Sequence, residues 1–404
     1  MDEQQSELWN EKDFLPDDQQ ENLDDDRDDL DTSDVVLYST DWTVESVIKQ
    51  IEKKRIDLNP AFQRRQAWSV AHRSKFIESL LLSIPIPQIV LAEDPNKKGH
   101  YIVIDGKQRL LALSQFVQDE NDNNRFERYK LRSLSSALKK SAQIKGKFFH
   151  ELDEEEQSII ENSVLRTVII RSVNNDKFLY EAFLRLNQGS KALSSQELRQ
   201  ALSPGHFTNW LENYVCTSET VQRALRISDP DPRMRDTEVV LRFMAFRDGL
   251  DGYNGKFKEL LDNFMIKMNA QYSSEIDASI VLSGELERAI NTTMIIFGDN
   301  AFEKFDAERD AFTGKFNRAI FDSMTFFFAD KNVSDLAVEK HAVVKKAFIK
   351  LCSESPTYLS AVESSFKDVR QTYNRLYLWR EKLAEVLNIE LIEIKIEDNK
   401  IRVG

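Results

Sequence analysis

The sequence has few cysteines and no long apolar run, and each shortage excludes a class of protein. Only two of the 404 residues are cysteine, Cys216 and Cys352, and they lie far apart along the chain. Such a pair supports neither a disulfide framework nor a zinc site, and it fits a reducing compartment. Because no apolar run reaches the roughly 18 residues that cross a membrane, the sequence predicts no transmembrane helix. The acidic N-terminal segment does not have the pattern of a signal peptide, so we expect a cytoplasmic protein that does not contact the membrane.

Acidic charge is concentrated at one end of the chain. Residues 1–34 contain 15 Asp or Glu and 2 Lys or Arg, whereas the whole chain has 68 acidic and 55 basic residues. The remaining sequence therefore carries 53 of each and is neutral overall. Because it has so few apolar residues, the segment 1–34 is expected to form a disordered tail. It acts either as a solubilising tail or as an autoinhibitory mimic of phosphate that occupies a basic groove.

Apolar periodicity predicts two kinds of domain, and the predicted fold class is α+β. A mixed domain occupies residues 35–205, a mainly α-helical domain follows over 206–387, and residues 388–404 alternate around Asp398-Asn399 as in a β-hairpin. The expected elements of the mixed domain are a helix capped at Asp41, a short strand at 56–58, a helix over 69–83, strands at 88–92 and 101–104, a helix over 110–117, a strand over 165–171 and helices over 177–186 and 195–202. The clearest expected helices of the second domain are 236–247, 256–270, 315–329 and 366–386.

The most informative segment runs from a predicted strand into a predicted helix through Asp105-Gly106. Glycine permits a sharp turn there and the close approach of a ligand, and the first amides of the helix carry the positive end of its dipole. Lys107 and Arg109 add full positive charges, and Arg109 has a planar fork suited to phosphate oxygens. Asp105 and Gln108 have oxygens that orient a water molecule or a metal ion. These groups meet the needs of phosphoryl chemistry, although an ordinary turn before an exposed helix has the same pattern.

Two further motifs flank this segment. Residues 59–69 read Asn-Pro-Ala-Phe-Gln-Arg-Arg-Gln-Ala-Trp-Ser, and residues 84–87 read Ile-Pro-Ile-Pro. Downstream, residues 184–199 read Leu-Arg-Leu-Asn-Gln-Gly-Ser-Lys-Ala-Leu-Ser-Ser-Gln-Glu-Leu-Arg. In this order, and with Asp-Gly-Lys-Gln-Arg at 105–109 between them, the motifs resemble the amino-terminal domain of the GmrSD restriction endonucleases. That family belongs to the ParB/sulfiredoxin-like superfamily, and the resemblance covers about residues 38–205.

The resemblance implies a ParB/sulfiredoxin-like fold with a site that binds and hydrolyses a nucleoside triphosphate. The family pattern is Asp-Gly-Gln-Gln-Arg, and this chain matches it at Asp105, Gly106, Gln108 and Arg109. Lys107 replaces a glutamine, and its charge either strengthens phosphate binding or disturbs the placement of water. The motif therefore supports binding more directly than hydrolysis. The resemblance implies Asp105, Gln108 and Arg109 as catalytic residues, Gly106, Lys107 and Arg109 as nucleotide ligands, and Asp105 as a ligand of Mg²⁺ bound with ATP or GTP.

Three residues outside the central motif complete the predicted nucleotide site. Gln63 and Arg64 match the family's Gln-Arg after an aromatic residue, and their amide and guanidinium groups suit phosphates or base edges. Alternatively, Arg64 pairs with a carboxylate such as Glu197 to hold the fold. Asn187 matches the family's Asn-x-Gly element, yet with Gly189 it fits a helix C-cap equally well.

Other activities lack the residues that they need. The five histidines are isolated from one another in the sequence, which therefore predicts no His-Asn-His nuclease, because that chemistry needs a general-base histidine beside metal ligands. Neither cysteine is near Gly106, which excludes sulfiredoxin chemistry. Basic residues do gather in places and favour contact with DNA, although solvated helices also carry such charges. The basic stretches are 53–75 with Arg73, then Arg125, Arg128, Lys130 and Arg132 near Phe126 and Tyr129, and then 139–147.

The sequence therefore predicts an NTP-binding and NTP-hydrolysing component of a bacterial restriction or anti-phage system. It would sense foreign or modified DNA and report to an effector protein in another chain, without a nuclease domain of its own. The alternative is a non-catalytic reader that binds DNA or a partner protein through the same cleft. A nuclease with an unrecognised site is the third hypothesis, and homo-oligomerisation stays open.

Overall fold

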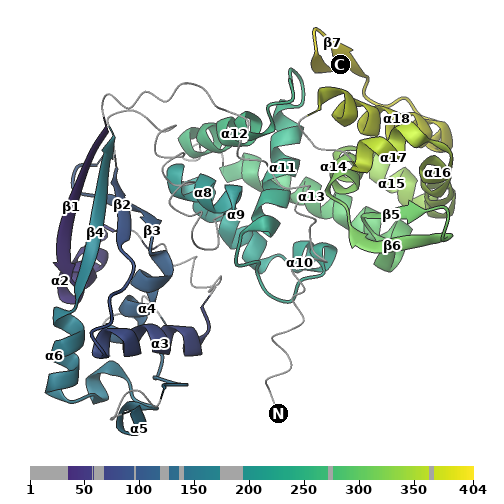
Figure 1. Cartoon of the computed structure of the whole chain (residues 1–404). Helices are drawn as coiled ribbons and strands as arrows, with labels where there is room; N and C mark the ends of the chain where they lie inside the picture. Colours follow the sequence, from purple (N-terminus) through teal and green to yellow (C-terminus); the bar gives the residue numbers. More distant parts are fainter. Residues whose placement is uncertain are drawn as a thin grey trace. The chain divides into compact units, whose positions relative to one another are not determined.

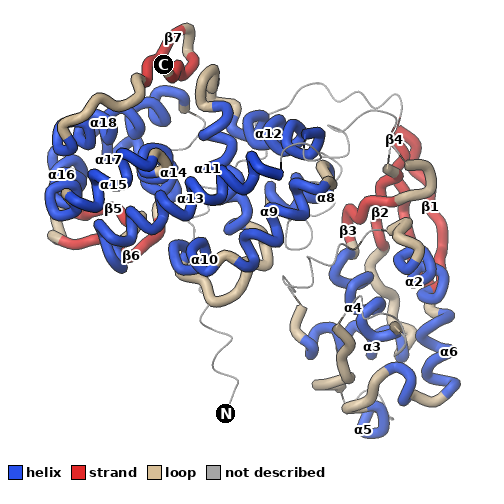
Figure 2. Tube along the Cα trace, turned by 180° about the vertical axis from the view of Figure 1, so that it is seen from behind, coloured by secondary structure: helices blue, strands red, loops and turns tan. Residues whose placement is uncertain are grey.

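The computed structural model describes residues 35–56, 58, 68–94, 97–118, 127–135, 141–172, 194–271, 276–363 and 368–404. They divide into two compact units, of which the first ends at Leu202 and the second comprises Ser203–Gly404 (Figure 1). The α+β class is confirmed, since the large sheet lies in the first unit and the second is built mainly of helices (Figure 2). The predicted tail 1–34, the helix at 177–186 and the residues Gln63, Arg64 and Asn187 lie outside the described residues.

A four-stranded sheet with the strand order β1-β4-β2-β3 organises the first unit. β1 pairs with β4 in antiparallel register over nine residues, and β2 runs parallel to β4. The two strands predicted at 88–92 and 101–104 correspond to β2 and β3, which pair as an antiparallel hairpin. All five residues of β2 are buried, as expected for a strand with a neighbour on each side. The strands are β1 (Val35–Thr43), β2 (Ile89–Glu93), β3 (Tyr101–Asp105) and β4 (Val164–Ser172).

Short helices pack on this sheet and share one apolar core with it. Residues from α2, α3, α4 and α6 contribute to the core, and α3 lies against both α4 and α6 (Figure 1). The helices of the first unit are α2 (Val44–Glu52), α3 (Val70–Leu81), α4 (Lys107–Val117), α5 (Ser141–Ile144), α6 (Glu154–Asn162) and α8 (Ser195–Leu202), with a 3₁₀ turn η3 at Phe149–Glu151.

Three predictions about local structure in this unit are wrong. Asp41 does not cap a helix, because it lies in β1, and α2 is capped by the Thr43 side chain, which accepts a hydrogen bond from the Ser46 amide. The expected strand at 56–58 is reduced to an isolated bridge between Ile56 and Tyr101. The helix expected from residue 110 begins three residues earlier, directly after the Asp-Gly turn.

Helices fill the second unit, with two small antiparallel hairpins, β5–β6 and β7–β8, beside them. The predicted helix over 315–329 is wrong at its start, because residues 315 and 316 belong to β6 and the helix is capped by the Asn317 side chain. Among the described residues no helix is both long and apolar enough to cross a membrane.

The helices are α9 (His206–Thr217), α10 (Glu219–Leu225), α11 (Arg235–Gly249), α12 (Phe257–Gln271), α13 (Ile276–Phe297), α14 (Arg318–Phe328), α15 (Lys331–Glu339), α16 (His341–Glu354), α17 (Pro356–Glu363) and α18 (Val369–Leu387), with a 3₁₀ turn η4 at Gly298–Asn300. The strands are β5 (Glu303–Asp306), β6 (Ala311–Phe316), β7 (Ile394–Glu397) and β8 (Lys400–Val403).

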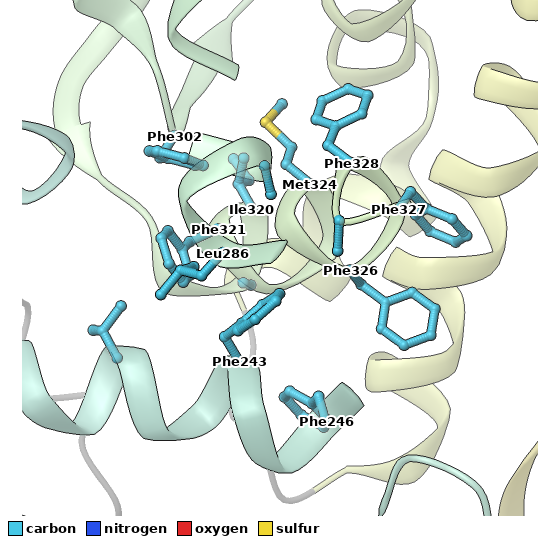
Figure 3. Packing of buried hydrophobic residues seen from close by; sticks show 14 of the residues in the cluster. Phe243, Phe246, Leu286, Phe302, Ile320, Phe321, Met324, Phe326, Phe327 and Phe328 are labelled. Carbon is cyan, nitrogen blue, oxygen red and sulfur yellow. The ribbon is translucent and has the colours of Figure 1, made fainter. Parts of the chain in front are cut away.

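Helices α11 and α14 form the centre of the second unit, and α14 is buried along its whole length. Their aromatic residues interdigitate with side chains of α13 and of the segment before β5 (Figure 3). The same two helices carry buried charges that pair with each other. Arg242 of α11 forms an ion pair with Asp322 of α14, and Glu238 lies 3.3 Å from Arg318. Because an unmatched buried charge is costly, these pairs fix how the two helices face each other.

Candidate functional site

The turn between β3 and α4 has a backbone shape that requires glycine. Gly106 is buried, with φ 97° and ψ 9°, in the left-handed region that side chains disfavour. A Cβ at this position would lie 2.4 Å from Cδ1 of Ile89, which belongs to the neighbouring strand. The Gly106 carbonyl accepts the Leu110 amide at 2.9 Å and so starts the helix. Strand, turn and helix follow one another here as the sequence predicts.

The N-terminus of α4 differs from those of α2, α3 and α6. α2, α3 and α6 begin with a side chain, from Thr43, Ser69 and Asp153 respectively, that accepts a first-turn amide. α4 begins at Gly106, which has no side chain to cap it. Amides of an uncapped first turn, at the positive end of the helix dipole, attract an anion. This end of the helix is therefore suited to an oxygen-rich anionic group such as phosphate.

Asp105 and Arg109 form an ion pair across this turn. The Arg109 Nη2 donates to Oδ2 of Asp105 at 2.8 Å, and the Gly106 amide donates to Oδ1 at 2.7 Å. The Arg109 side chain is 11% exposed and that of Asp105 is 28% exposed. The carboxylate is thus held in one orientation by two donors while part of it stays open to solvent.

Arg109 also binds the backbone before β2. Its Nη1 donates to the carbonyl of Pro87 at 2.5 Å and to that of Gln88 at 3.3 Å. The guanidinium therefore joins the Ile-Pro-Ile-Pro segment to the end of β3. Sequence reasoning did not assign these two carbonyls to the site, because backbone acceptors do not depend on residue type. The Ile-Pro-Ile-Pro motif was the only sign that this segment belongs to it.

The other predicted members of the site are at its rim. Lys107 and Gln108 lie on the first turn of α4, and both are partly exposed. Helix α8 contacts β3, so Glu197 comes from an element beside the site. Its carboxylate accepts the Ser194 amide at 2.7 Å and so caps its own helix. The first-turn pair of Lys107 and Gln108 therefore offers one cation and one amide beside the Asp105 carboxylate.

A magnesium ion held by protein side chains alone does not fit this turn. In the described part of the chain, no three His, Cys, Asp or Glu side chains gather in a way that holds a metal ion. Asp105 supplies one carboxylate, and its two oxygens already accept hydrogen bonds from Gly106 and Arg109. Mg²⁺ prefers six oxygens in an octahedron and takes most of them from water and substrate phosphates when the protein offers few. A magnesium ion here would need oxygen ligands that the described side chains of this turn do not supply.

Arg73 and Tyr129, which the sequence places in the basic stretches, have buried side chains. Arg73 is 8% exposed, donates to Oε1 of Gln115 at 2.6 Å, and has its guanidinium 4.7 Å from the Tyr129 ring centroid. Burial lowers the pKa of Arg73 and raises that of Tyr129. The expectation that these two side chains contact DNA is therefore wrong. Both lie in the interface where α3 and α4 pack against the segment that follows α4.

The comparisons with known proteins identify this unit. A family model described as the GmrSD restriction endonuclease, N-terminal domain, matches residues 44–203. No curated protein and no solved structure matches the chain. The match begins at the first residue of α2 and ends just after α8, so it includes the Asp105 turn, the Ile-Pro-Ile-Pro segment and the sheet strands β2, β3 and β4. Residues 44–203 are therefore similar to the N-terminal domain of the GmrSD restriction endonucleases.

Proposed function

We propose that this chain is the NTP-binding and NTP-hydrolysing sensor of a restriction system, with the turn between β3 and α4 as its nucleotide site. One observation carries the proposal. A fixed, partly exposed carboxylate lies beside an uncapped helix N-terminus, with Lys107 on the first turn. Phosphoryl transfer needs anion binding and a group that orders the attacking water, and this turn offers both. The match of residues 44–203 to the GmrSD restriction endonuclease N-terminal domain supports the role in restriction.

The residues of the turn have distinct proposed roles. Amides of the first turn of α4 and the Lys107 ammonium bind the phosphates, and Gly106 lets them approach the backbone. Asp105 and Gln108 orient the attacking water toward the terminal phosphorus. Gln63, Arg64 and Asn187, which are not among the described residues, stay in the proposal as nucleotide ligands on the strength of the sequence motifs alone.

Arg109 acts as a positioning residue in this proposal. Its guanidinium donates to Asp105, Pro87 and Gln88 and is only 11% exposed, so most of its donors already bind the protein. It therefore fixes Asp105 and the backbone before β2, and its effect on the phosphates is electrostatic. ATP or GTP enters with its own Mg²⁺, which neutralises phosphate charge.

DNA, foreign or modified, is the proposed signal, and an effector protein in another chain is the proposed receiver. Phosphate release from ATP and GTP with magnesium, with and without DNA, tests the proposal. Asp105→Asn and Arg109→Lys should each lower release at least tenfold, because each removes the fixed carboxylate geometry. Arg171→Lys is the matched control, since Arg171 pairs with Glu93 elsewhere on the same sheet and should leave release unchanged. Equal rates of phosphate release by the wild type and these three variants would contradict the proposal.

A second candidate function is a reader that binds nucleotide or DNA without turnover. One observation favours it: both oxygens of Asp105 already accept hydrogen bonds, one from the Gly106 amide and one from Arg109, which leaves less of the carboxylate to orient an attacking water. Lys107, which replaces the glutamine of the family pattern, also favours a reader over an enzyme. Nucleotide binding that Lys107→Glu abolishes, with no phosphate release by the wild type at any DNA concentration, would support the reader.

A further inference from the structure

A surface of the first unit, built around residues 127–132, combines cations with aromatic rings and belongs to neither the nucleotide site nor the core. These residues run without helix or turn, and their side chains alternate. Tyr129 and Leu131 are 5% and 0% exposed, whereas Lys130 and Arg132 are exposed and Arg128 is half-buried. The alternation places cations at every second residue, and these lie roughly 6.6 Å apart along an extended chain.

A second segment lies beside the first and adds to the same surface. The Leu131 amide donates to the Lys147 carbonyl at 3.1 Å, and the Gly146 amide donates to the Leu131 carbonyl at 2.8 Å. These bonds bring Lys147, Phe148 and His150 next to the row of cations. We call Arg128, Lys130, Lys147, Phe148 and His150 the cation–aromatic surface.

The Phe148 ring organises this surface. The Arg128 guanidinium lies 4.6 Å and the Lys130 ammonium 4.7 Å from the ring centroid. The His150 ring stacks on Phe148 at 5.7 Å with 16° between the planes, and its Nδ1 is 2.7 Å from Nη2 of Arg128. Contacts of this kind hold long side chains in place, so a ligand that binds them loses less side-chain entropy.

The charge of the two segments is strongly positive. Residues 127–132 and 145–151 contain five Lys or Arg and two Glu. Glu151 turns back to accept the Phe148 amide at 2.7 Å, and this bond is the main reason that its pKa is lowered. The charges of Lys130, His150 and Lys147 add to that lowering, so Glu151 offsets part of the positive charge. The charge of Glu127 acts on the buried Arg73, where it opposes the lowering of the pKa that burial causes. With five cations against two carboxylates, the two segments keep an excess of positive charge.

We propose that the cation–aromatic surface binds single-stranded nucleic acid. Regularly spaced cations follow one phosphodiester backbone, and the exposed His150 ring extends a stack to which an unpaired base adds. A duplex presents its bases only at groove edges, where a flat stack of rings cannot reach their faces. The inference rests on the DNA-sensing part of the proposed function and gives that sensing a location separate from the nucleotide site.

The test measures binding of a fluorescent 20-nucleotide single strand by the full chain, as anisotropy over a range of salt concentrations. Lys130→Glu with Lys147→Glu should weaken binding at least tenfold at low salt. Each phosphate contact contributes about 0.7 to the slope of log affinity against log salt for single strands, so losing two should reduce the slope by about 1.4. The matched control is Lys97→Glu with Lys98→Glu, which changes the charge equally at two exposed lysines of the β2–β3 loop and should change affinity less than twofold.

A third variant probes the rings. Phe148→Leu keeps an apolar side chain but removes the ring, and it should weaken binding about threefold to tenfold with little change in salt slope. Thermal unfolding of each variant shows whether the fold survives. Three results would each overturn the proposal. They are equal losses of affinity in the test and control pairs, tighter binding of a duplex than of the single strand, and full competition by poly-glutamate. ATP binding is measured in parallel. Its loss in Lys107→Glu alone and its persistence in the lysine pair keep a failure of this surface apart from a failure of the nucleotide site.

Discussion

Each unit of the molecule contains an arginine–aspartate pair, and the two pairs serve different purposes. In the second unit the side chains of Arg242 and Asp322 are 1% and 2% exposed, and Arg375 approaches the same carboxylate at 4.0 Å. Burial lowers the pKa of Arg375 to about 10, a measure of how dry this region is. In the first unit the side chains of Arg109 and Asp105 are 11% and 28% exposed. A charge pair removed from water holds a fold together, whereas a pair that keeps one edge in solvent can act on a ligand.

Breaking the buried pair should have the largest effect on stability. Asp322→Ala leaves Arg242 beside Arg375 without their shared carboxylate, and removal of one partner of a buried pair costs about 3–5 kcal/mol. We expect a large fall in the midpoint of urea unfolding. Asp335→Ala is the control, because its pair with Lys331 is exposed and exposed pairs contribute about 0–1 kcal/mol. Similar midpoints for the two variants would refute the structural role of the buried pair.

The rate at which a buried thiol is labelled shows which unit loses stability in Asp322→Ala. Cys352 is buried in the second unit, and burial raises the pKa of its thiol to about 11, so at pH 8 the folded protein holds it as an unreactive thiol. Opening of the helical unit lets the pKa fall to its ordinary value, and reactivity then appears. Asp322→Ala should therefore speed the labelling of Cys352 by a thiol reagent. Arg109→Lys should leave the labelling rate unchanged, and acceleration by both variants would contradict the comparison.

A smaller loss should follow a change at the turn of the first unit. Gly106→Ala forces a side chain into a left-handed conformation, which costs about 1–3 kcal/mol, and places its Cβ against Ile89. Gly99→Ala has a similar φ but nothing within 4 Å of its Cβ, so it reports the conformational cost alone. Replacing Ile89 by Val removes the clashing methyl group. Part of the excess loss in Gly106→Ala should disappear in the double variant, and additive losses would show that the contact is unimportant.

The weakest expected effect concerns the acidic segment 1–34. If it competes with nucleic acid for basic side chains, its removal should tighten single-strand binding severalfold at low salt and hardly at all near 0.5 M salt, because salt screens charge. Anisotropy titrations of the full and shortened chains measure the difference. Unchanged affinity at low salt would leave the segment as a solubilising tail.

Local signals in the sequence predicted part of the fold well. The helix over 69–83 and the Asp-Gly turn after an apolar strand are each predicted from a few neighbouring residues, and they correspond to α3 and to the turn before α4. β1 was missed because its partner is distant: Val35 pairs with Ser172. Once Asp41 lies in that strand it cannot cap the next helix, and the error at the start of α2 follows.

The site shows the same division between local and distant information. Residue types and spacing identified the segment 105–109 as a candidate site. They did not show that Arg109 binds the carbonyls of Pro87 and Gln88, because those acceptors belong to the backbone of a segment that precedes β2. The sequence therefore favoured Arg109 as a phosphate ligand, and the geometry favours it as the residue that positions Asp105.

A double-mutant cycle of Asp105→Ala and Arg109→Ala on kcat/KM for nucleotide hydrolysis tests that central claim most directly. If Arg109 acts by holding Asp105, the two residues work as a unit, and the double variant should be no slower than the slower single variant. If instead the losses multiply, Arg109 and Asp105 act on the nucleotide independently, and the positioning role of Arg109 is contradicted.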